Sequence, residues 1–151
     1  YSIVLSLIFF SCNNNSLIET NKLNESNDSI EIHYMRPYVK TSFSYTCDMI
    51  NEEALKKDIN YKVFNDSNTI NKFLKIYNNY VLESSQDEKI NARIRILINV
   101  GSNRDTLCLG ENHNTFINGI KFKDNAEMLS FIKEIIDYEN TPRPNFPKKD
   151  N

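Results

Sequence analysis

Three cysteines carry the most distinctive chemistry of this sequence, and Cys12 is the most informative of them. It follows an uncharged, almost wholly apolar run over residues 1–11 and precedes a polar run over 13–16. This order is typical of a secretory signal that ends in a bacterial lipobox, where cleavage exposes a cysteine whose thiol takes a lipid. We therefore expect residues 1–12 to be a signal and lipobox segment and Cys12 to be lipidated. The alternative is a buried core strand over 3–10.

The apolar run is shorter than the roughly 20 residues that span a bilayer. The chain begins at Tyr1 rather than at a methionine, and we expect the true start of the signal to precede it. The segment thus indicates export with lipid anchoring, rather than a transmembrane helix.

Cys47 and Cys108 remain as an even pair once Cys12 is assigned to the lipid. An oxidising compartment permits a disulfide between them, and such a bridge contributes about 2–4 kcal/mol to stability. The alternative is two buried free cysteines that pack as small hydrophobic side chains. No cation lies beside either thiol in the sequence, so we do not expect a cysteine nucleophile.

Histidine is the next candidate for chemistry, because an imidazole can act as a base or bind a metal ion. His33 and His113 lack the spacing of a metal-binding pair such as His-x-x-x-His. A site that uses both, with Asp105 or Glu111, requires the fold to bring them together. We expect two solvated histidines, no metal ion and no catalytic residue.

Two arginines on one predicted strand are the best candidates for binding. Arg93 and Arg95 alternate with isoleucines and would share the outer face, where a guanidinium can bind a carboxylate through two hydrogen bonds. The alternative is cross-strand pairing with Asp105 or Glu111.

The loop over 113–116 is a second candidate contact site. It joins His113 to Phe116, and polar loops that carry an aromatic side chain are common in interfaces. A core position for Phe116 is the simpler alternative.

These residues must be positioned by a mixture of strands and helices. Alternating apolar residues predict strands, and apolar residues at helical spacing predict helices. Tight turns between consecutive strands favour antiparallel pairing, most clearly at Asn118-Gly119. The predicted fold is a single two-layer α+β sandwich, an antiparallel sheet with two main helices on one face. The expected strands are 30–34, 43–47, 59–63, 92–100, 105–110 and the two arms of a hairpin over 116–122; the expected helices are 48–57, 67–82 and 125–138.

Side-chain patterns also predict the helix caps and the core. Asp66 or Ser67 can cap the first main helix, and Asp124 can cap the second, with Glu127 in capping-box spacing. One apolar stripe on the first helix extends to Val81. The expected core consists of Ile94, Ile96, Ile98, Phe73, Leu74, Tyr77, Phe131, Ile132 and Ile135.

Composition divides the chain into four parts. The signal over 1–12 is followed by a flexible tether over 13–28, which is poor in apolar residues. The α+β domain spans 29–140, and a proline-rich tail spans 141–151.

A net charge of −2 and the lack of a basic stripe with aromatics argue against nucleic-acid binding. Three glycines cannot build a phosphate loop or a dinucleotide fingerprint, so no cofactor is expected.

The chain resembles small uncharacterised lipoproteins of the Bacteroidetes type. The features that carry this resemblance are the Cys12 lipobox, the paired Cys47 and Cys108, the run Arg93-Ile94-Arg95-Ile96, the turn Asn118-Gly119 and the C-terminal helix. The resemblance covers about residues 1–140 and implies export and lipid anchoring, with no activity and no catalytic residues.

Together these observations predict a monomeric lipoprotein anchored to a bacterial envelope membrane and facing the periplasm. Its domain would be a non-enzymatic module that binds another protein, for example as an inhibitor or immunity factor. The alternative is a small-ligand-binding protein or an envelope hydrolase with a cleft near His33 or His113.

Overall fold

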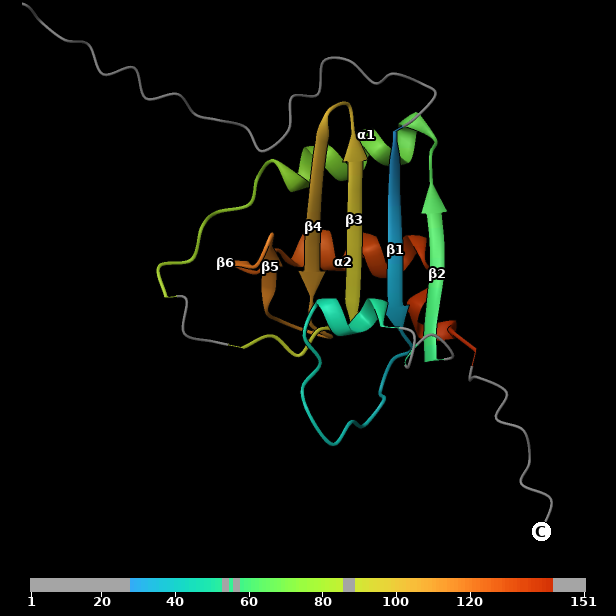
Figure 1. Ribbon diagram of the computed structural model, residues 1–151. Coiled ribbons are helices and arrows are strands. Elements are labelled where there is room, and N and C mark those ends of the chain that lie inside the picture. Colours follow the sequence, from blue (N-terminus) through green and yellow to red (C-terminus); the bar gives the residue numbers. More distant parts are fainter. Residues whose placement is uncertain (1–27, 53–54, 56–57, 86–88, 143–151) are drawn as a thin grey trace, which may run out of the picture.

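The computed structural model describes residues 28–52, 55, 58–85 and 89–142. These residues form one six-stranded antiparallel sheet with two α-helices, which confirms the predicted α+β class (Figure 1). The strand order is β2-β1-β3-β4-β5-β6. Cys12, the signal segment and the tether up to residue 27 lie outside the described residues, as does the tail from residue 143.

Each strand follows from an alternating run in the sequence. In β3 every second side chain, from Ile94 to Val100, is buried against the helices, which is the pattern of a strand with one covered face. The strands are β1 (Ser29–Met35), β2 (Ile59–Phe64), β3 (Ile94–Val100), β4 (Asn103–Leu109), β5 (Thr115–Ile117) and β6 (Ile120–Phe122).

The predicted hairpin is present between β5 and β6. Asn118 and Gly119 both have positive φ angles, 50° and 80°, as a two-residue turn of this kind requires. The Asn118 side chain also accepts a hydrogen bond from the backbone N–H of Thr106, at 2.8 Å, and so holds the turn against β4.

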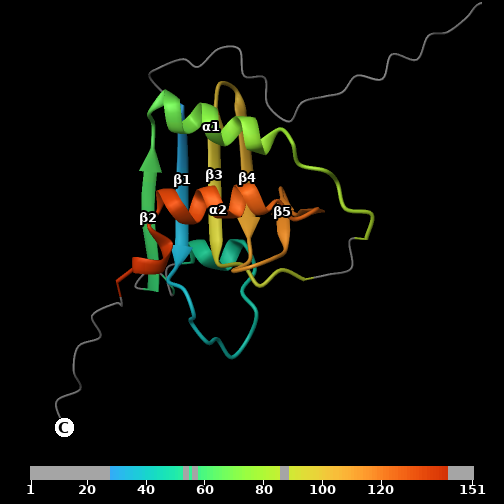
Figure 2. The same ribbon diagram turned by 180° about the vertical axis from the view of Figure 1, so that it is seen from behind.

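Both α-helices lie on the same side of the sheet (Figure 2). The first, α1 (Ser67–Tyr77), is capped by Asp66, whose carboxylate accepts from the N–H of Thr69 at 2.8 Å. It ends before residue 82, where the sequence placed its end, because Asn78 forms the C-cap and the chain then runs beside β6. Val81 is consequently 55% exposed and is not part of the buried stripe.

The second helix is α2 (Ala126–Ile135), which is also shorter than predicted. Asn125 rather than Asp124 caps it, with its side chain accepting from the N–H of Met128 at 3.0 Å. Asp124 instead accepts from the hydroxyl of Thr115 at 3.0 Å. Ile136 is the C-cap of the helix, and Asp137 then adopts a left-handed conformation that turns the chain into the 3₁₀ turn η3 (Tyr138–Asn140).

The core lies between the sheet and the two helices. All of the predicted core residues are buried except Ile135, which is partly buried and packs against the cluster. Asp28, which we expected in the tether, is also buried and accepts from the N–H of Gly101 at 2.8 Å. The folded domain therefore includes the last residue of the predicted tether.

The predicted strand over 43–47 is wrong. Tyr45 is buried and Phe43 is 54% exposed, but no strand pairing is described for 43–47. The Tyr45 carbonyl accepts from the N–H of Ala92, which precedes β3. Cys47 instead leads into a 3₁₀ turn, η1 (Asp48–Asn51), where a longer helix was expected. Residues 36–51 thus form a strap that crosses one end of the sheet; we call them the strap.

Candidate functional site

The face of the sheet opposite the helices is the candidate binding surface, and we call it the open face. The strap crosses its lower end in Figure 1, while the helices lie behind the sheet. Tyr61 and Val63 of β2 are 54% and 46% exposed, although both are large hydrophobic residues. Strand register also assigns to this face Glu31, His33, Arg95, Leu97, Asn99, Thr106, Cys108, Phe116 and Lys121.

Six of these residues form one row across the whole sheet. His33 of β1 pairs with Tyr61 on one side and with Arg95 on the other, and Arg95 pairs with Cys108. Phe116 and then Lys121 continue the row through β5 and β6. This transverse row brings together two predicted binding residues, Arg95 and Phe116, and one histidine.

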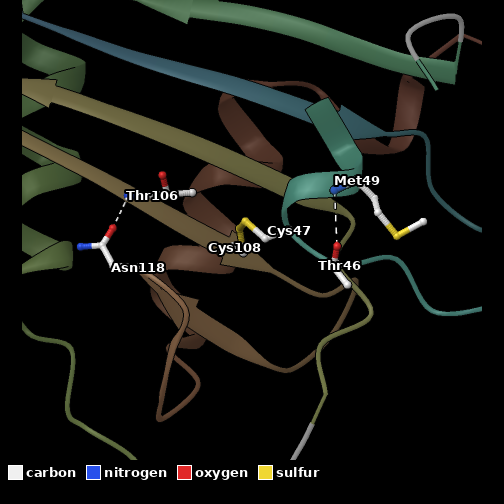
Figure 3. Close-up of a disulfide and its surroundings, with 6 residues drawn as sticks. All are labelled: Thr46, Cys47, Met49, Thr106, Cys108 and Asn118. Atoms are coloured by element: carbon white, nitrogen blue, oxygen red, sulfur yellow. Dashed lines mark hydrogen bonds between the residues drawn. A yellow bond between two sulfur atoms is a disulfide. The ribbon is translucent and has the colours of Figure 1, made fainter. Parts of the chain in front are cut away.

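The Cys47–Cys108 disulfide is present (Figure 3). Strand register pairs Cys108 with Arg95. The two Cα atoms are 5.9 Å apart, so the prediction of a bridge is confirmed. Cys108 lies on a strand as expected, but Cys47 belongs to the strap, and the bridge lies on the open face. It therefore fastens the strap to the sheet.

His33 is half-buried between an aromatic ring and a cation. Its imidazole lies against the ring of Tyr61, with 4.8 Å between centroids and 53° between the planes. Burial and the positive charge of Arg95 lower the pKa of His33, while Glu31 opposes them. The neutral imidazole is consequently favoured on this face.

The two predicted arginines have different environments. Arg93 is only 5% exposed, because its guanidinium reaches the sulfur of Met35 at 3.5 Å and the hydroxyl of Thr41 at 3.3 Å. Arg93 is therefore not available at the surface, contrary to expectation, because its guanidinium lies against Thr41 of the strap. Arg95 is on the open face and half-buried, and its Nε and Nη1 atoms are shielded from solvent without a hydrogen-bond partner.

The acids proposed as partners of these arginines are engaged elsewhere. Asp105 faces the helices and accepts from the hydroxyl of Tyr77 at 3.2 Å and from the side chain of Asn118 at 2.6 Å. Glu111 accepts from the backbone N–H of Tyr38 at 2.8 Å. Cross-strand neutralisation of the arginines by Asp105 or Glu111 is thus absent among the described contacts.

The histidines line two separate clefts. A cleft of about 360 Å³ lies beside His33 on the open face, and one of about 370 Å³ lies beside His113 at the start of α2. The first is lined by Glu31, His33, Ile50, Asn51, Glu52, Ile59 and Tyr61. A joint site that uses both histidines is therefore not formed.

The His113 cleft is lined by both apolar and polar side chains. Leu109, Ala126 and Leu129 lie beside His113 and Lys133. The loop that carries His113 is tight, because the N–H of Gly110 donates to the carbonyl of Asn114 at 3.0 Å, and a Cβ at Gly110 would collide with the His113 carbonyl oxygen.

Ser130, His113 and Asp124 share this cleft, yet they form no hydrogen-bonded relay in the described structure. The carboxylate of Asp124 is bonded to Thr115, as noted above. A serine nucleophile requires a base within hydrogen-bond reach and a group that orients the base. The arrangement is that of a polar cleft rather than an assembled triad.

Within the described ranges, no group of three or more His, Cys, Asp or Glu side chains is placed to hold a metal ion. None of the helices in the same ranges has the length and apolar character needed to cross a membrane. Comparisons with protein-family models, curated proteins and solved structures found no match to this chain.

Sequence reasoning missed Tyr61 as a surface residue. It assigned 59–63 to a weak edge strand without predicting which face each residue occupies. The register of β2 against β1 places Tyr61 beside His33, and no short motif encodes that pairing. The missing information was strand order, which is decided by long-range packing.

Proposed function

We propose that this protein is an exported lipoprotein whose domain binds another protein through the open face, without catalysing a reaction. The observation that carries the proposal is the exposure of Tyr61 and Val63 beside half-buried His33 and Arg95. Tyrosine and arginine are enriched among the residues that dominate protein interfaces. A broad sheet face suits a protein partner better than a small ligand, which is usually enclosed on several sides.

Two features support export and lipid anchoring. The Cys47–Cys108 disulfide is of the kind that persists in oxidising compartments. The apolar run before Cys12 has the pattern of a lipobox signal, and the polar residues after it would act as the tether. In this proposal the domain is monomeric and faces the periplasm from an envelope membrane, as the resemblance to small Bacteroidetes-type lipoproteins implies.

An inhibitor or immunity factor is the specific kind of binder we favour. Such a protein needs a rigid surface that is already shaped before the partner arrives. The disulfide provides rigidity here by fastening the strap to β4 at the edge of the exposed area.

Membrane anchoring is tested by Cys12→Ala in the full chain. We expect the wild-type protein in the membrane fraction and the variant in the soluble fraction, because the lipid attachment point is gone. Equal membrane association of both proteins would contradict lipid anchoring at Cys12.

Partner binding is tested by Val63→Lys, with Val81→Lys as the matched control. The two valines have similar exposure, 46% and 55%, but Val63 is on the open face and Val81 follows α1. Proteins captured from an envelope extract by the wild-type chain should be lost with Val63→Lys and retained with Val81→Lys. Equal capture by both variants would place the partner elsewhere.

A second candidate function rests on the His113 cleft, whose volume of about 370 Å³ suits a small ligand. His113→Ala would then reduce binding or turnover of that ligand, and Val63→Lys would leave it unchanged. If Val63→Lys abolishes protein capture and His113→Ala does not, the result favours the open face over this cleft as the binding site.

A further inference from the structure

We propose that Arg95 binds the carboxylate of an acidic side chain on the protein partner, while Tyr61 and Val63 contact an apolar residue beside that acid. This inference rests on the proposed function and specifies the chemistry of the partner. It concerns the part of the open face between β2 and β3, where these three side chains and His33 lie.

The state of the Arg95 guanidinium is the first argument. Its Nε and Nη1 atoms are shielded from water and have no hydrogen-bond partner, so most of the loss of hydration has already occurred in the free protein. Arg95 as a whole is half-buried rather than buried, so part of the residue stays accessible to an incoming group. A charge in such a low-dielectric environment attracts an opposite charge more strongly than an exposed one does.

The second argument is that nearby acids do not neutralise Arg95 in the described contacts. Glu31 is on the same face but accepts from the side chain of Asn99 at 3.4 Å. No ion pair joins Glu31 to Arg95 in the part of the chain that the structure describes. An external carboxylate would therefore supply a counter-charge that none of the contacts among the described residues provides.

The neighbours of Arg95 decide the orientation of the partner. Toward β2 the surface becomes aromatic and apolar at Tyr61 and Val63, and the adjacent cleft is lined by Ile50 and Ile59. Glu31 and Glu52 line the same cleft and would repel a second acid there. The acid therefore lies over Arg95 and the apolar residue lies toward β2.

A matched pair of arginines allows a direct test. Arg104 is also on the open face, but it is exposed and its guanidinium donates to the carbonyls of Gly101 and Asn103, at 3.3 and 2.7 Å. Arg95→Gln and Arg104→Gln each remove one positive charge from the same face. The probes are the peptide acetyl-Leu-Glu-Leu-amide and its neutral analogue with Gln in place of Glu.

The readout is the side-chain Nε–H resonance of Arg95 in the ¹⁵N-arginine-labelled full chain, assigned by its loss in Arg95→Gln. We expect the Glu peptide to move this resonance at least about fivefold further than the Gln peptide, because charge-assisted hydrogen bonds are the stronger ones. Binding of the Glu peptide, followed at the backbone of β1 and β2, should weaken at least about tenfold in Arg95→Gln and less than about twofold in Arg104→Gln.

Three results would overturn the inference. The first is an equal shift of the Arg95 resonance with the Glu and Gln peptides. The second is an equal loss of affinity for the Glu peptide in Arg95→Gln and Arg104→Gln. The third is a shift with sodium acetate as large as that with the Glu peptide at the same concentration, which would indicate a general anion site. Should Arg95→Gln fail to fold, the comparison of the two peptides on the wild-type chain still tests the inference. If Val63→Lys abolishes partner capture but the chain shows no preference for the Glu peptide, this inference is rejected. The proposed function is then still supported.

Discussion

Arg95 faces His33 directly across β1 and β3, which places a permanent positive charge beside an imidazole. The charge of Arg95 and the burial of the ring both lower the pKa of His33, and burial is the larger cause. Titration of His33 therefore reports on the electrostatic state of the open face.

Removal of the Arg95 charge should raise the pKa of His33. Arg95→Gln eliminates the repulsion between guanidinium and imidazolium but leaves the burial of the ring unchanged. The pKa should therefore move toward the ordinary value of about 6.5 without necessarily reaching it. Titration of the His33 ring protons by NMR measures the change. Arg104→Gln is the control and should have a much smaller effect, and an unchanged pKa in Arg95→Gln would contradict the assigned contact.

The lowered pKa of His33 also makes stability depend on pH. The unfolded chain takes up a proton at about pH 6.5, whereas the folded domain does so only at lower pH. The free energy of unfolding should thus fall as pH decreases through 6.5 toward the folded pKa. Urea denaturation of the full chain at pH 7.5 and pH 5.5 measures this loss. His33→Asn should reduce the difference in the free energy of unfolding between pH 7.5 and pH 5.5. His113→Asn is the control and should leave the part of that difference due to His33 unchanged.

Loss of the disulfide should destabilise the domain strongly. The bridge joins residues 61 apart, and closing a loop of that length corresponds to about 4 kcal/mol in the chain-entropy model. The double variant Cys47→Ala/Cys108→Ala should therefore lower the free energy of unfolding by about this amount in urea denaturation. A reducing agent should have a similar effect on the wild-type chain and little effect on the variant. Equal stability of both proteins would show that the strap contributes nothing through this bond.

Gly110 should tolerate alanine less well than Gly101 does. An added Cβ at Gly110 would collide with the carbonyl oxygen of His113, whereas at Gly101 it would meet nothing within 4 Å. Gly101 does have a positive φ of 57°, so its replacement should cost about 1–2 kcal/mol from backbone strain alone. Gly110→Ala should exceed that value, because backbone atoms must move to relieve the clash. Chemical denaturation of the two variants gives the comparison.

Local patterns in the sequence predicted most of the fold. The alternation from Ile94 to Val100, the cap at Asp66 and the Asn118-Gly119 turn each depend on neighbouring residues, and each is present. The prediction of a strand over 43–47 was wrong because it also used only neighbouring residues. The alternation around Tyr45 reflects one buried side chain, not pairing with a neighbouring strand.

The candidate site was predicted only in part. Arg95 and the Cys47–Cys108 pair were identified from residue type, but the burial of Arg93 was not, because the strap residue Thr41 that contacts it is distant in the sequence. The transverse row depends on which strands are neighbours. That order results from packing between distant segments, and the sequence of any one strand does not contain it.

The most direct test of binding through the open face is site-specific photo-crosslinking in the living cell. A photoreactive phenylalanine derivative replaces Tyr61, which is 54% exposed on the open face, or Lys75, which is exposed on α1 on the opposite side of the sheet. The account predicts a discrete crosslinked adduct with one envelope protein from position 61 and none from position 75. Adducts from position 75 alone, or none from position 61 in repeated experiments, would contradict partner binding at this face.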